Sequence, residues 1–110
     1  MSRWDIVEPY HHKKTDRDGT TRYYNEQNQP HREDGPAVEY ADGTKSWWVN
    51  GKRHREDGPA IEWADGTKEW WVDGKRHRLD GPAIENSDGS KEWYVNGRKL
   101  TEEEFRRLHP

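Results

Sequence analysis

The sequence predicts an all-β protein: an elongated, single-layer antiparallel β-sheet of tandem hairpin repeats, with a short C-terminal capping helix. The first observation is a 23-residue unit that recurs without insertion over residues 31–53, 54–76 and 77–99. The second is the presence of Asp-Gly or Asn-Gly pairs between short strand-like runs in each unit. The third is composition: with 27% hydrophobic and 37% charged residues, the chain cannot bury a large core. It suits a stack in which each unit contacts only its neighbours.

Residues 1–30 are predicted to form a degenerate N-terminal unit of the same single repeat domain, which spans residues 1–110. Residues 18–24 (DGTTRYY) repeat the pattern of residues 42–48 (DGTKSWW), with a one-residue shift before the next unit begins. Terminal units of repeat arrays commonly diverge in this way, because one of their faces has no neighbouring unit.

Charge pairing predicts the turn that joins the two strands of each unit. In residues 54–76, a two-residue turn would place Glu62 opposite Glu69, whereas a three-residue turn with Gly66 in the left-handed position pairs Glu62 with Lys68. The longer turn is therefore expected. The same register places Pro59 beside Trp71, and the chain that follows the second strand is expected to be a longer loop.

Aromatic residues are predicted to form two columns on opposite faces of the sheet, because side chains alternate along a strand. Equivalent strands lie two strands apart, so rings in one column repeat at roughly 9–10 Å and something else must fill the gap. A single layer cannot bury both faces, so one column is expected to bind a partner protein or a second copy of the chain in a homodimer. The sequence leaves open which one. The candidate partner-binding residues are Trp47, Trp70 and Trp93 in one column, and Trp48, Trp71 and Tyr94 in the other.

Residues 101–109 are predicted to form a short helix that covers the edge of the last hairpin. Thr101 suits the N-cap, and Glu104 three positions later completes a capping box. Leu100 and Phe105 fit a hydrophobic staple around the helix start.

These residues resemble a known family. The stretch W-x-V-[ND]-G-[KR], followed by H-R-x-D-G-P-A and a later D-G, resembles the MORN repeat over residues 15–99, in unit length, order and turn position. It departs from that pattern where Arg32, Arg55 and Arg78 stand in place of the Gly that follows the His, and in the D-G-P-A that comes next. This variant is similar to HRxDGPA repeats of phage, giant-virus and bacterial proteins.

The resemblance implies an elongated single-layer sheet that acts by protein–protein contact or dimerisation, with lipid binding disputed and no active site. It also implies a scaffold role, such as that of a phage- or virus-encoded inhibitor of a host defence protein. That step is an analogy at the level of fold.

A second candidate function is nucleotide or single-stranded nucleic-acid binding. Basic residues would form a ridge along one edge of the array, where phosphates could pair with them and bases could stack on nearby rings. Acidic neighbours and a net charge of −3 argue against it. The residues of this ridge, candidates for anionic-ligand binding, are Lys52, Arg53, Arg55, Lys75, Arg76 and Arg78.

No enzymatic activity, cofactor or metal site is expected. The chain has no Cys and no Gly-rich phosphate loop, and three of its six His residues recur once per unit, which is typical of a structural role. His31, His54 and His77 are predicted to lie two strands apart, too far for a single ion to bind two of them. No apolar segment of signal-peptide or membrane-spanning length occurs, so a cytoplasmic protein is expected, in the host cytoplasm if the protein is viral.

Overall fold

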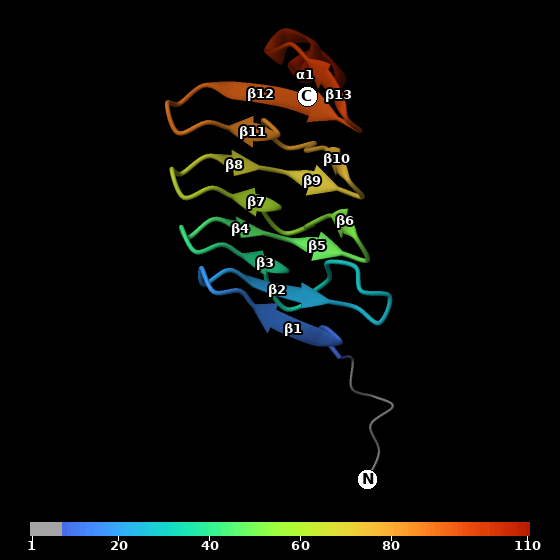
Figure 1. Ribbon diagram of the computed structural model, residues 1–110. Coiled ribbons are helices and arrows are strands. Elements are labelled where there is room, and N and C mark those ends of the chain that lie inside the picture. The colour runs from blue at the N-terminus through green and yellow to red at the C-terminus, as the bar shows by residue number, and fades with distance from the viewer. Residues whose placement is uncertain (1–7) are drawn as a thin grey trace.

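The computed structural model describes residues 8–110 and confirms the predicted fold class: antiparallel β-hairpins follow one another in a row that ends in one short helix (Figure 1). The molecule measures 54 × 34 × 21 Å along its principal axes. Residues 1–7 of the predicted N-terminal unit lie outside the described residues.

The strands are short, and most belong to one sheet of nine strands in the order β1-β2-β3-β4-β7-β8-β11-β12-β13. The pairs β5-β6 and β9-β10 form separate two-stranded hairpins. The elements are β1 (His12–Thr15), β2 (Thr21–Tyr24), β3 (Val38–Glu39), β4 (Lys45–Ser46), β5 (Trp48–Val49), β6 (Lys52–Arg53), β7 (Ile61–Glu62), β8 (Lys68–Glu69), β9 (Trp71–Val72), β10 (Lys75–Arg76), β11 (Ile84–Glu85), β12 (Lys91–Val95), β13 (Arg98–Leu100) and α1 (Glu102–Leu108).

The wide turn of each unit has the predicted three-residue form. Glu62 pairs with Lys68 across β7 and β8, and Gly66 adopts a left-handed φ of 97°, which costs glycine little. The side chain of Asp65 accepts a hydrogen bond from the backbone N–H of Thr67 at 2.9 Å. Thr67 in turn accepts one from the backbone N–H of Ser87 at 3.1 Å, so each wide turn is joined to the next.

The segment expected as a long loop is instead a second, tight hairpin. Trp71 pairs with Arg76 and Val72 with Lys75, and the turn residues Asp73 and Gly74 both have positive φ, at 50° and 80°. That is the conformation of a two-residue type I′ turn, for which Asp-Gly and Asn-Gly are the usual sequences. Every unit of residues 31–99 therefore contains two hairpins, one wide and one tight.

The expected position of Pro59 beside Trp71 is wrong, because the pairing between the two strands of the wide hairpin ends before Trp71. The Trp70 N–H donates to the carbonyl of Ala83 in the next unit at 2.7 Å, while Trp71 already pairs with Arg76. The expectation assumed one continuous strand, whereas β8 ends at Glu69 and β9 begins at Trp71.

The core is a thin line of small and branched side chains, as the polar composition requires. Ala37, Ala60 and Ala83 are fully buried, and the residue after each, Val38, Ile61 and Ile84, is nearly so. With so little apolar volume, polar side chains must supply much of the packing between units.

The C-terminal helix begins as predicted. The Thr101 side chain accepts from the Glu104 N–H at 3.0 Å, and Glu104 accepts from the Thr101 N–H at 2.9 Å, forming the capping box. Leu100 and Phe105 are both buried, and α1 packs against β12 and β13. Within residues 8–110 no helix has the length and apolar character needed to span a bilayer.

Candidate functional site

Guanidinium groups fill the gap between the rings of the second aromatic column. Arg53 lies 4.7 Å from the Trp48 ring and 4.9 Å from the Trp71 ring. Arg76 lies 5.0 Å from Trp71 and 5.3 Å from Tyr94. Cations over aromatic faces attract the ring quadrupole, so this column is a continuous stack of alternating rings and cations. We call these five residues the ladder.

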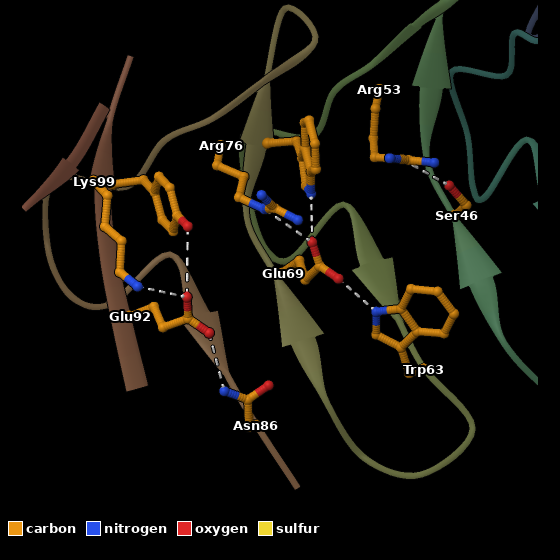
Figure 2. Close-up of polar contacts among 10 residues, drawn as sticks. Ser46, Arg53, Trp63, Glu69, Arg76, Asn86, Glu92 and Lys99 are labelled. Atoms are coloured by element: carbon orange, nitrogen blue, oxygen red, sulfur yellow. Dashed lines mark hydrogen bonds and ion pairs between the residues drawn. The ribbon is translucent and has the colours of Figure 1, made fainter. Parts of the chain in front are cut away.

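A carboxylate holds the ladder together from the adjacent strand (Figure 2). Glu69 is buried, and its Oε1 accepts from the Trp71 indole N–H at 3.1 Å and from Arg76 Nε at 3.3 Å. Its Oε2 accepts from the Trp63 indole N–H at 2.7 Å. Three donors thus meet one carboxylate, which is how a buried charge is made tolerable.

Glu92 repeats this arrangement more loosely in the next unit. It accepts from the Tyr94 hydroxyl at 3.5 Å and from Asn86 at 3.4 Å, and it pairs with Lys99 at 3.4 Å (Figure 2). Burial acts to raise the pKa of Glu92, but the hydrogen bonds from Asn86 and Lys99 outweigh it and hold the pKa below its usual value.

Arginines of the H-R-x-D-G-P-A motif lie over two rings of the first aromatic column, Trp47 and Trp70. The third ring, Trp93, instead lies on β12 opposite Leu100. The Arg55 guanidinium lies 3.9 Å from the Trp47 ring and donates to Asp57 at 3.0 Å and to the carbonyl of Pro59 at 3.0 Å. It also donates to Glu62 at 3.2 Å. Arg55 therefore contacts one residue of the preceding unit, Trp47, and three residues of its own unit.

The glycine of D-G-P-A leaves room for this clamp. A Cβ at Gly58 would lie 3.0 Å from Arg55 Cζ, and one at Gly81 would lie 2.9 Å from Arg78 Cζ. A larger residue would therefore require the guanidinium to shift from its place over the ring. The equivalent Arg78 lies 3.8 Å from the Trp70 ring, so the motif has the same role in each unit.

The six predicted partner-binding aromatics fall into two groups with different neighbours, as expected for opposite faces. All six are partly exposed. Trp47 and Trp70 lie in grooves between successive H-R-x-D-G-P-A loops, while Trp48, Trp71 and Tyr94 belong to the ladder.

The six predicted anionic-ligand residues do not form one ridge. Arg53 and Arg76 are inserted in the ladder, and Arg55 and Arg78 clamp the opposite column, each bound to two carboxylates. Lys52 and Lys75 are exposed on β6 and β10.

Sequence reasoning missed the most exposed rings on the ladder side. Tyr40 is 40% exposed and Trp63 45% exposed, and both line a pocket together with Ser46 and Arg53. The available signal was the recurrence of an aromatic residue just before the wide turn in two successive units, with Asn86 in the third.

The repeated histidines have a structural role. Each repeated histidine accepts, through Nδ1, a hydrogen bond from the backbone N–H of the first turn residue of the tight hairpin in its own unit. The pairs are His31 with Asn50 at 2.9 Å, His54 with Asp73 at 3.0 Å and His77 with Asn96 at 2.9 Å. An accepting Nδ1 requires a neutral ring protonated at Nε2. Among residues 8–110, no three His, Asp or Glu side chains gather as a metal site.

Comparison with family models, curated proteins and solved structures finds no significant match to this chain. The interpretation of the surfaces therefore rests on their geometry.

Proposed function

We propose that this chain is a non-enzymatic protein-binding module, a MORN-like repeat that docks a partner protein on the ladder side. The observation that supports it is the concentration of large, partly exposed rings and arginines there: Tyr40 and Trp63 flank the ladder. Tyr, Trp and Arg are the residue types that contribute most of the binding energy at protein interfaces. The ladder also fixes its side chains before binding, so little rotamer entropy remains to be lost on association.

The opposite face suits docking less well. Its arginines are already engaged by carboxylates and carbonyls, as the contacts of Arg55 and Arg78 illustrate. Satisfied groups of this kind gain little from a new partner, because new contacts would only replace existing ones.

Nucleic-acid binding is the weaker alternative for the same reason. Guanidinium groups occupy the spaces between the rings of the ladder, so bases cannot enter them. The basic residues of the predicted ridge are divided between two faces and largely paired.

The test compares Trp63→Ala with Leu79→Ala. Both side chains are exposed, but Leu79 lies in the groove beside Trp70 on the other side, so it is the control for loss of an exposed apolar side chain. Because Trp63 also donates to Glu69, circular dichroism must show that Trp63→Ala keeps the wild-type fold. Light scattering measures self-association, and affinity capture measures binding of other proteins. We expect Trp63→Ala to weaken association at least tenfold and Leu79→Ala to leave it unchanged. Equal behaviour of both variants, or a wild-type monomer that captures nothing, would remove the proposal.

A further inference from the structure

The unit of residues 31–53 lacks the carboxylate that contacts the ladder in the two units that follow. Ser46 occupies the position that Glu69 and Glu92 hold in the following units. Its hydroxyl oxygen accepts from the Trp48 indole N–H at 2.8 Å and from Arg53 Nε at 3.4 Å. These are the counterparts of the two bonds to Glu69 Oε1. Ser46 has no second oxygen and no charge to match Glu69 Oε2.

Arg53 is left without an anionic partner as a result. Among residues 8–110, no carboxylate oxygen comes within 4.0 Å of its guanidinium, whereas Arg76 lies 3.3 Å from Glu69 (Figure 2). Burial lowers the pKa of Arg53 because it disfavours the charged form. Glu69 and Tyr40 oppose that shift, and Arg76 adds to it. Arg53 is thus a partly buried cation that is attracted by Glu69 of the next unit but forms no ion pair with it.

A pocket of about 220 Å³ opens beside this cation. Tyr40 and Trp63 supply aromatic walls, Ile61 adds an apolar surface, and Ser46 and Arg53 supply polar groups. An apolar cavity with a few convergent polar groups is the usual form of a small-ligand site.

The acidic lining residue Asp42 does not exclude an anion from this position. Its carboxylate accepts from the backbone N–H of Thr44 at 2.9 Å. Asp65 stands at the equivalent place in the next unit, where Glu69 is nevertheless buried as a carboxylate. The protein thus provides its own example of a carboxylate bound in this environment.

We propose that this pocket binds the carboxylate of a ligand, with its charge beside Arg53 and its apolar or aromatic body between Tyr40 and Trp63. The ligand group takes the place that the Glu69 side chain fills one unit later. A free carboxylic acid and an acidic side chain of another protein share this chemistry. The inference does not depend on the proposed docking function.

Titration calorimetry of the full chain with benzoate tests the proposal. Ser46→Glu supplies the missing carboxylate from within and is expected to weaken benzoate binding at least tenfold. Ser87→Glu adds the same charge at an exposed turn and is expected to change binding less than twofold.

Two further titrants distinguish the ligand class. Inorganic phosphate is expected to bind at least tenfold more weakly than benzoate, and equal binding would overturn the assignment to carboxylates. N-acetylglutamate amide presents a protein-like carboxylate: if it binds as tightly as benzoate, the source is a protein side chain, and if more weakly, a free acid.

The inference is overturned if benzoate does not bind the wild type, or binds Ser46→Glu equally well. It stands, and the docking proposal falls, if benzoate binds while Trp63→Ala leaves protein association unchanged.

Discussion

Replacing Arg55 with Met removes the guanidinium clamp of the central unit but retains a side chain of similar length. The bond to the Pro59 carbonyl, made by a charged donor at 3.0 Å, is worth about 1.5 kcal/mol at the lower end of the range for charged groups. The stack on Trp47 at 3.9 Å adds about 0.5–1 kcal/mol. Asp57 is 88% exposed and Glu62 38% exposed, so these two ion pairs together add only about 0–1 kcal/mol.

The expected loss is therefore about 2–3.5 kcal/mol of unfolding free energy, or a fall in Tm of about 10–15 °C for a chain of this size. Urea denaturation followed by Trp fluorescence and far-UV circular dichroism measures it. Arg17→Met, in the exposed turn between β1 and β2, is the control and should change stability by less than about 0.5 kcal/mol. If Arg55→Met costs no more than this control, the clamp does not stabilise the array and the reasoning is refuted.

Three other substitutions probe separate contacts. His54→Ala should cost about 1 kcal/mol, measured by urea denaturation, because it removes the acceptor of the Asp73 N–H; an unchanged midpoint would contradict that role. The Thr67 backbone N–H is the main cause of the lowered pKa of Asp65, so the ionised form stabilises the fold above about pH 4, and this contribution is lost as pH falls through the folded pKa. Asp65→Asn keeps an accepting oxygen that does not titrate, so its stability should fall less steeply than wild type in acid denaturation below about pH 4. Thr101→Ala should cost about 1 kcal/mol in the same urea assay through loss of the N-cap, and a cost near zero would show that packing alone holds the helix.

Local rules predicted much of the fold. Charge pairing at the wide turn and the capping box at Thr101 each concern residues close in sequence, and the structure confirms both. The tight hairpin was missed even though Asp73-Gly74 signals it, because the basic segment after it was interpreted as a loop. A run of charged residues can form a strand when its guanidinium groups lie over aromatic rings, as that of Arg76 does.

The candidate surfaces were harder to predict, because they depend on contacts between units. Alternation along a strand separated Trp70 from Trp71 correctly but did not indicate that arginines fill the columns. The important difference between units, Ser46 in place of Glu69, is visible in the sequence. The sequence does not show that this position contacts an arginine. The structure shows that Arg53 donates to Ser46 as Arg76 donates to Glu69.

The links between units have a consequence for how such a chain can change in length. The Arg53 carbonyl accepts from the Gly74 N–H, and the Arg76 carbonyl accepts from the Gly97 N–H, both at 2.8 Å. Excising residues 54–76 would bring Arg53 to Gly97 and restore the same bond with a new partner. Among residues 31–99, loss or gain of whole 23-residue units therefore keeps every bond of this kind in register, whereas a deletion within a unit displaces the donor from its acceptor.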